Sequence, residues 1–354
     1  MHQYTADLAN RTVSIHEIHL VTTESYPSDR YHNKIAVHCP VSYSSTGLSV
    51  ESLNPKAITS VKRKIEQLSP DIVHFTGPHL WNLYLVNWLR KQNIPVIHTL
   101  HDMDPHIGVR NGRMLKMWNR FILNNSSRVL VHNKLYLSEL LEKGLQESQL
   151  MYFPLLHLFI SHHHSAKLMQ GMSQIDYEPF ALFFGRIEQY KGIDTLLESF
   201  EWLHSRSQSS EIISPKLVMA GSGKLPERWV SRLPSNVEVR NRFIADKEAI
   251  DLFSRCSLVV LPYIGATQSA IVASAYFFYK PVIISKSGAL EEYALAGRTG
   301  FLVNPGDSLA LAKTLENAFS PSIDLEEMGL CGRGWYDKNR EEESFNLFKM
   351  YRET

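Results

Sequence analysis

Short apolar runs alternate with amphipathic helical segments through the first half of the chain, and this alternation limits the possible folds more than any other feature. Residues 18–21, 71–75, 95–99 and 128–131 have the apolar character of buried strands. Helices are predicted at 4–9, 57–68, 80–91 and 135–143. This order predicts an α/β fold, in which a mostly parallel sheet carries helices on both faces.

Length and composition are those of an ordinary globular protein with two domains. The chain has 354 residues, of which 44% are hydrophobic and 21% charged, enough for two separate cores. Its cysteines, Cys39, Cys256 and Cys331, are too far apart in sequence for a disulfide framework or a metal-binding spacing. Charged residues interrupt the beginning of the chain, where a secretory signal would be apolar. A cytoplasmic location is therefore predicted.

A strand, a glycine and two cations follow one another at residues 182–194. The apolar run 182–184 predicts a buried strand, and Gly185 allows a tight turn after it. Arg186 and Lys191 then precede a helical segment. An arginine fork and a mobile ammonium group at a strand end match the oxygens of a phosphate. The alternative is an ordinary surface Arg and Lys at a strand–helix turn.

A second segment, residues 256–279, contains no charged residue and has the hydropathy of a membrane span. Pro262, Gly265 and the polar Thr267-Gln268-Ser269 divide it instead into a strand at 258–261, a loop and a helix. Ser269 is the predicted N-cap of that helix. The free N–H groups of its first turn are expected to face the carboxyl end of the strand.

From residue 183 to about 319 the sequence resembles the C-terminal domain of the retaining glycosyltransferases of family 4. These enzymes have the GT-B fold, two Rossmann-like domains that face each other across a cleft. The matching pieces occur in the same order and at similar spacing, at residues 185–192, 220–223, 261–263, 280–283, 288–292 and 297–303. The resemblance implies the same α/β fold and transfer of a sugar from a nucleotide-sugar donor.

The resemblance also implies roles for individual residues. In this family the arginine and lysine that follow the strand hold the donor diphosphate, with the helix start at Gln268-Ser269 as backbone partner. Here these two residues are Arg186 and Lys191, which together with Gly185 form what we call the cationic corner. A histidine just past the strand 95–99 lies at the sugar, so His101 joins Arg186 and Lys191 as the implied catalytic set. The implied donor-binding set is Gly185, Arg186, Lys191, Gly221, Arg242, Phe243, Thr267, Gln268, Ser269, Ser274 and Glu292. No cofactor and no metal are implied, because the nucleotide sugar is itself the substrate.

The chain departs from the family pattern at two carboxylates. Family members commonly carry two glutamates eight positions apart, the second of which holds the ribose hydroxyls. Those places are occupied here by Ala266 and Ser274. A serine hydroxyl can still bond a ribose hydroxyl, but more weakly than a carboxylate.

The amino terminus departs as well. In the family a buried first strand and a glycine-rich loop precede the helix that corresponds here to residues 4–9. Three explanations stay open at this point: a start further upstream, a truncated gene, or a rearranged sheet. A central strand of five apolar residues represents on the order of 10 kcal/mol of burial, as much as the net stability of a domain.

The predicted organisation has four parts. Residues 1–155 form an acceptor-side Rossmann-like domain, 156–177 a linker, 178–343 a nucleotide-sugar-binding Rossmann-like domain, and 344–354 a helix that packs back on the first domain. The predicted acceptor is a glycan or a lipid-linked molecule of cell-surface polysaccharide biosynthesis. Two other functions fit the departures: a glycosyltransferase-like partner or regulatory protein with weakened catalysis, and a nucleotide-sugar epimerase, which would need carboxylates in the cleft.

Two further patterns have alternative interpretations. Arg110, Arg113, Lys116 and Arg120 occupy about one third of a helical wheel, which suits peripheral contact with an anionic membrane or simply a solvated helix face. Asp102-Met103-Asp104, near His98 and His106, resembles the carboxylate pair of metal-dependent glycosyltransferases of the other major fold. The cationic corner already supplies charge for a diphosphate, so no metal is predicted. Residues 162–164, all histidine, are interpreted as polar linker.

Overall fold

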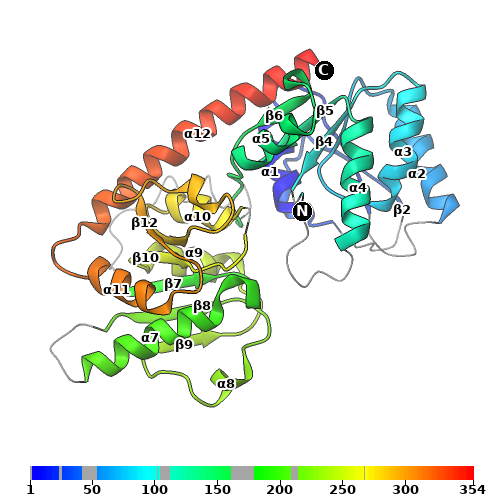
Figure 1. The fold of residues 1–354 in the computed structure, drawn as a ribbon. Helices are drawn as coiled ribbons and strands as arrows, with labels where there is room; N and C mark the ends of the chain where they lie inside the picture. The colour runs from blue at the N-terminus through cyan, green and yellow to red at the C-terminus, as the bar shows by residue number, and fades with distance from the viewer. Residues whose placement is uncertain are drawn as a thin grey trace.

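The chain folds into two α/β domains that are crossed by one long C-terminal helix (Figure 1). The computed structural model describes residues 2–23, 26–41, 54–101, 103, 112–160, 179–208, 214–266 and 268–354, with the backbone alone for 112–116. Every strand pair in both domains is parallel in this described part. The predicted α/β class is confirmed.

The N-terminal domain contains two separate sheets. One is the pair β1 (His19–Thr23) and β2 (Ala36–Val41). The other has the order β3-β4-β5-β6, with β3 (Val73–Phe75), β4 (Val96–Leu100), β5 (Arg128–Val131) and β6 (Leu150–Tyr152). The helices of this domain are α1 (His2–Thr12), η1 (Ser28–Arg30), α2 (Pro55–Leu68), α3 (Leu80–Lys91), α4 (Gly112–Asn125), α5 (Lys134–Glu142) and η3 (Glu147–Gln149).

The C-terminal domain contains one six-stranded sheet with the order β12-β11-β10-β7-β8-β9. Its strands are β7 (Phe180–Phe184), β8 (Lys216–Ala220), β9 (Val237–Arg240), β10 (Leu258–Leu261), β11 (Val282–Ser285) and β12 (Gly300–Val303). Its helices are η4 (Gln189–Lys191), α7 (Ile193–Ser207), α8 (Glu227–Val230), α9 (Asp246–Arg255), α10 (Ala270–Phe277), η5 (Leu290–Tyr293) and α11 (Ser308–Ala318). The central strands are continuous apolar runs because helices cover both faces of a parallel sheet.

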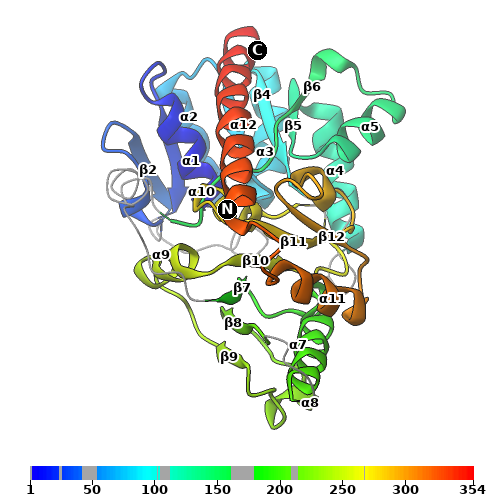
Figure 2. The same cartoon turned by 90° about the vertical axis from the view of Figure 1, so that its left-hand side faces the viewer.

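The last helix is much longer than the sequence pattern suggested. α12 spans Leu325–Glu353, so it begins within the C-terminal domain and ends on the N-terminal one, rather than starting at 344. Figure 2 shows it running along both domains. Its Arg340 forms a two-pronged ion pair with Asp7 of α1, with both N–O distances 2.8 Å. Near its end, the Tyr351 hydroxyl lies 2.7 Å from His74 Nδ1 of β3.

The beginning of the predicted linker is also different from expectation. Residues 156–160 include four buried apolar side chains rather than a polar spacer. The Phe159 ring lies 4.9 Å from that of Phe184 and 4.8 Å from that of Phe253, which belong to the C-terminal domain. The segment is therefore part of the core, while residues 161–178, including the three histidines, lie outside the described part.

Candidate active site

Three loops of the C-terminal domain meet at the carboxyl edge of its sheet. They follow β7, β8 and β10, and parallel strands bring such ends to one edge. Gly221 has φ +148°, and a side-chain carbon there would lie only 2.0 Å from the Gly185 carbonyl oxygen. The Ile264 N–H donates to the Tyr190 carbonyl at 2.8 Å. The glycine contact and this hydrogen bond fix the cationic corner between the other two loops.

Lys191 is the central cation of this corner. The residue is only 8% exposed, and its Nζ lies close to Gly185, where an added side-chain carbon would come within 2.8 Å of it. The same Nζ is 5.3 Å from the centre of the Tyr263 ring. Among the described residues no carboxylate pairs with Lys191. A buried ammonium group with no counter-ion favours an anion beside it.

Arg186 lies at the rim of the corner. Its side chain is 69% exposed and forms an ion pair with Glu188 at 2.8 Å. Such an exposed pair contributes little to stability, so the guanidinium group can exchange partners at small cost. The predicted pair of cations thus has two different members, one largely buried and one exposed.

The first turn of α10 completes this wall of the site. Ser269 is its N-cap, as the sequence predicts, and its Oγ accepts a hydrogen bond from the Ile271 N–H at 3.3 Å. The Tyr263 hydroxyl lies 3.5 Å from the same Oγ. Tyr263, which the sequence interpretation did not single out, therefore lies between Lys191 and the helix start. Thr267 lies outside the described residues.

His101 and Gln268 join the two domains across the cleft. Gln268 Nε2 donates to the His101 carbonyl oxygen at 2.8 Å, while its buried Oε1 has no partner in the described part of the chain. His101 Nε2 donates to the Thr76 carbonyl at 3.0 Å, which leaves Nδ1 as an acceptor. Burial, followed by the neighbouring His132, lowers the pKa of His101 to about 3. At neutral pH this ring is uncharged.

Two residues of the implied donor-binding set, Ser274 and Glu292, are bonded to other parts of the protein in this structure. Ser274 is completely buried, and its hydroxyl donates to the Ala270 carbonyl at 3.1 Å within α10. A short side chain at this place on the helix has no surface left for a ribose hydroxyl. Glu292 accepts hydrogen bonds from the N–H groups of Lys134 and Leu135 at 2.8 and 3.2 Å. Its carboxylate caps α5 of the other domain, where the helix dipole favours it.

Arg242 and Phe243 follow the edge strand β9. Arg242 is held by Glu248 at 2.7 Å, and the Phe243 side chain is 79% exposed. The neighbouring Asn241, also missed in the sequence, exchanges two hydrogen bonds of 3.0 Å with the backbone of Gly223. This contact ties the end of β9 to the loop after β8, beside the Lys191 corner.

The remaining predicted features are only partly described. In the basic helix, Arg120 is exposed and Trp118 and Ile122 are buried, whereas Arg110 and the side chains of Arg113 and Lys116 lie outside the described residues. Asp102, Asp104 and His106 also lie outside them. The described residues contain no group of three metal-ligating side chains and no helix that is apolar and long enough to span a bilayer.

The structure thus has two α/β domains with parallel sheets, and the carboxyl ends of their strands face each other. This is the arrangement of the GT-B class. Two family models match the sequence, one described as "Glycosyltransferase Family 4" over residues 1–154 and one as "Glycosyl transferases group 1" over 178–320. The chain belongs to this family of glycosyltransferases, which confirms the predicted family and the predicted GT-B fold.

Relatives and solved structures agree with this assignment. An uncharacterized glycosyltransferase of Methanocaldococcus jannaschii is 24% identical over 82% of this chain and 77% of its own length. The sulfoquinovosyl transferase SQD2 of Arabidopsis thaliana is 21% identical over 82% of this chain and 58% of its own. The structure of a sucrose-phosphate synthase from Thermosynechococcus elongatus superposes with a TM-score of 0.75 at 19% identity, over 99% of this chain and 92% of that one. Anabaena HepE in complex with UDP-glucose gives 0.71 at 15% identity, over 99% and 96%.

Proposed function

We propose that the protein transfers a sugar, with retention of configuration, from a nucleotide-sugar donor to a hydroxyl of a glycan or lipid-linked acceptor. The observation that carries this proposal is Lys191, a largely buried lysine at the carboxyl edge of the sheet that pairs with no carboxylate of the described residues. HepE, a structural neighbour, binds UDP-glucose. That fact supports a nucleotide-sugar donor for this chain.

In the proposed mechanism the corner acts on the leaving group. The bond between the sugar C1 and the diphosphate oxygen breaks, and negative charge develops on the diphosphate. Lys191, Arg186 and the N–H groups at the start of α10 stabilise that charge more in the transition state than in the ground state. The cations make a metal unnecessary for this step.

The other wall of the cleft orients the sugar and the acceptor. His101, whose Nδ1 is left as an acceptor, orients the transferred sugar together with Gln268, whose Oε1 has no partner in the described part of the chain. The acceptor oxygen bonds to C1 on the face that the diphosphate leaves, and its proton goes to a diphosphate oxygen. Closure of the two domains excludes water from the reaction. The acceptor is proposed to belong to cell-surface polysaccharide biosynthesis, with Arg120 and its neighbours at the membrane surface.

A panel of UDP-, GDP- and ADP-sugars tests the proposal. Release of free nucleotide that rises on addition of an acceptor, with a product of unchanged anomeric configuration by NMR, is the expected result. Donor binding without release would favour the second candidate, a non-catalytic partner. That candidate is supported by Ala266 and the buried Ser274, which stand at the two places where the family pattern described above commonly has glutamates. Conversion of the donor to its epimer without release would indicate an epimerase.

A further inference from the structure

The first turn of α1 packs against His101, the histidine that orients the sugar in the proposed function. The Tyr4 ring meets the His101 ring edge to face, with 4.8 Å between the ring centres and 89° between the ring planes. Tyr4 is only 4% exposed, and its ring also lies 5.0 Å from that of His132 and 5.8 Å from that of His157. Contacts on several sides restrict an aromatic ring to one position. Tyr4 therefore offers His101 a fixed surface.

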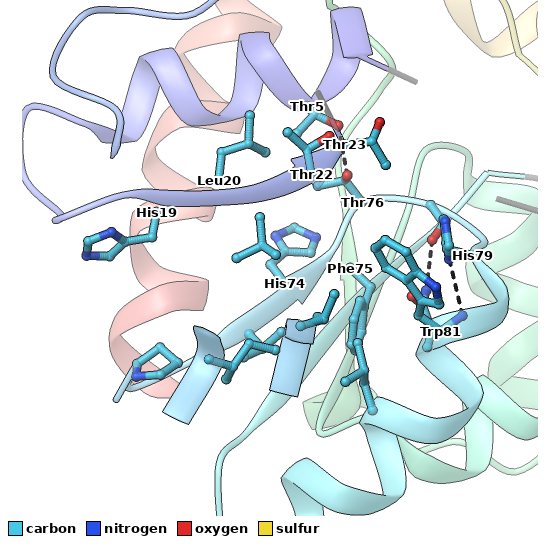
Figure 3. Close-up of a pocket in the computed structure, with 18 of the residues that line it drawn as sticks. Thr5, His19, Leu20, Thr22, Thr23, His74, Phe75, Thr76, His79 and Trp81 are labelled. Atoms are coloured by element: carbon cyan, nitrogen blue, oxygen red, sulfur yellow. Dashed lines mark hydrogen bonds between the residues drawn. The ribbon is translucent and has the colours of Figure 1, made fainter. Parts of the chain in front are cut away.

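The Tyr4 hydroxyl belongs to a buried chain of polar groups that ends on the last helix. It lies 3.1 Å from Thr99 Oγ1, and the same Oγ1 lies 2.9 Å from His74 Nε2. His74 Nδ1 lies 2.7 Å from the Tyr351 hydroxyl of α12. Thr99 is completely buried, and His74 lies at a cavity lined by β1 and β3 (Figure 3). Both ends of the Tyr4 side chain are thus held, the ring by packing and the hydroxyl by this chain.

Thr5, the next residue of α1, acts on the hydrogen bond of the His101 ring. Its hydroxyl lies 2.8 Å from that of Thr76, the residue that follows β3 (Figure 3). The Thr76 carbonyl in turn accepts the N–H of His101 Nε2 at 3.0 Å. Two successive residues of one helix therefore reach both the packing surface and the hydrogen-bond acceptor of His101.

We propose that Tyr4 is a positioning residue, whose ring keeps the His101 imidazole within reach of the Thr76 carbonyl. This role rests on the proposed function, which places His101 at the sugar. A neutral imidazole carries its proton on either nitrogen, and the hydrogen bond to Thr76 selects Nε2. Nδ1 is then always the acceptor. A ring that is free to leave the carbonyl would offer the sugar this acceptor in only part of the molecules.

Nitrogen NMR of the whole chain with ¹⁵N-labelled histidine tests this role directly. The signals that disappear in His101→Gln identify His101. The wild type should show the two ring-nitrogen shifts of a single Nε2–H tautomer. Tyr4→Met, which fills a similar volume without a rigid ring, should move both shifts toward the average of the two tautomers. Tyr4→Phe keeps the ring and should keep the wild-type shifts, as should Tyr84→Met at an exposed tyrosine of α3.

Turnover gives a second readout. Tyr4→Met should lower kcat for sugar transfer about 10- to 100-fold, because a slightly misplaced group costs that much, and Tyr4→Phe should retain most of the activity. The affinity for the nucleoside diphosphate that binds the wild type should not change, since Arg186 and Lys191 lie in the other domain. Thermal unfolding establishes that each variant is folded.

The results that would overturn the role of Tyr4 are equally distinct. They are mixed tautomers at His101 in the wild type, wild-type shifts in a folded Tyr4→Met protein, and a loss of nucleotide affinity as large as the loss of kcat. Equal changes in Tyr4→Phe and Tyr4→Met would assign the effect to the hydroxyl chain and contradict the role of the ring. The NMR result needs neither donor nor acceptor. Absence of transfer by a wild type with a single Nε2–H tautomer would therefore count against the proposed function alone.

Discussion

The two domains share one plan but differ in the chemistry of their interiors. The C-terminal domain has one sheet, and its central strands, such as Leu258–Leu261 and Phe180–Phe184, are wholly apolar. The N-terminal domain has two sheets, and its central strand β4 contains the fully buried His98 and Thr99. The cationic corner follows strands of the apolar, undivided sheet. The polar, divided core on the other side of the cleft is easier to perturb.

Buried histidines are the main source of this polarity. His74, His98, His101, His132 and His157 all lie in the N-terminal domain or just after it, and burial lowers the pKa of each to about 3 or 4. The Thr99 hydroxyl lies 2.9 Å from His74 Nε2 and 3.1 Å from the Tyr4 hydroxyl. The described C-terminal domain holds one histidine, the half-buried His204.

The largest predicted effect is therefore acid-induced unfolding that begins in the N-terminal domain. Below pH 6.5 the unfolded chain takes up protons on these histidines while the folded one does not, so stability falls as the pH falls. Each histidine contributes up to about 1.4 kcal/mol per pH unit below that point. Hydrogen exchange at pH 7 and at about 5.5 should show β4 and β5 losing protection before β10 and β11. Loss of protection at the same pH in both sheets would contradict the expected difference in acid stability between the domains.

A smaller effect is expected from Arg340→Ala, which tests how the N-terminal domain is attached to α12. Burial alone would raise the pKa of Asp7, but Arg340 and Arg11 outweigh it and lower that pKa. Without Arg340 this mostly buried carboxylate loses its two-pronged partner, at a cost of about 3–5 kcal/mol in the free energy of unfolding. Denaturant titration measures it. Lys338→Ala is the matched control on the same helix, since its pair with Glu342 is exposed and 4.0 Å long. An equal loss of unfolding free energy in both variants would show that the buried Arg340–Asp7 pair contributes no more to stability than an exposed pair.

The smallest effect concerns the contact between the two unlike domains. Gln268→Ala removes the hydrogen bond to the His101 carbonyl and should lower the free energy of unfolding by about 1 kcal/mol. Gln189→Ala, a change at an exposed glutamine of the same domain, serves as control and should be neutral. Thermal unfolding without ligand measures both. A loss above about 3 kcal/mol would mean that the domains depend on this contact far more than one hydrogen bond allows.

Local signals predicted some elements closely. The helix at 80–91, the strand at 258–261 and the N-cap at Ser269 agree with the structure, because apolar periodicity and capping residues act within a few positions. α12 shows the limit of such signals. Gly329 and Gly332 look like helix breakers, yet a side-chain carbon at these places would collide with the Tyr279 carbonyl and the Tyr276 ring. Close packing of α12 on α10 therefore requires glycine there, and no local rule reveals that.

Local signals in the sequence likewise located one part of the site, the cationic corner, but not the partners that packing decides. The order of glycine, arginine and lysine after a strand located the corner, since all three belong to one turn. Ser274 and Glu292 were assigned by position alone, and packing decides their partners in the structure. Ser274 bonds the α10 backbone, and Glu292 bonds the start of α5 in the other domain. Tyr263 belongs to the matching piece 261–263 but was given no role, because an aromatic residue after a strand does not by itself indicate a contact with a ligand.

Direct titration of a nucleoside diphosphate into the Lys191→Ala protein tests the central claim, that the buried ammonium group holds the donor diphosphate. UDP, GDP and ADP are each titrated by calorimetry into the wild type, into this variant and into Lys224→Ala, whose exposed lysine follows β8. Thermal unfolding establishes that the variants are folded. Loss of a charge-assisted hydrogen bond predicts about a 10- to 100-fold weaker affinity for Lys191→Ala and no change for Lys224→Ala. Unchanged affinity of a folded Lys191→Ala protein for the nucleotide that binds the wild type would contradict the account.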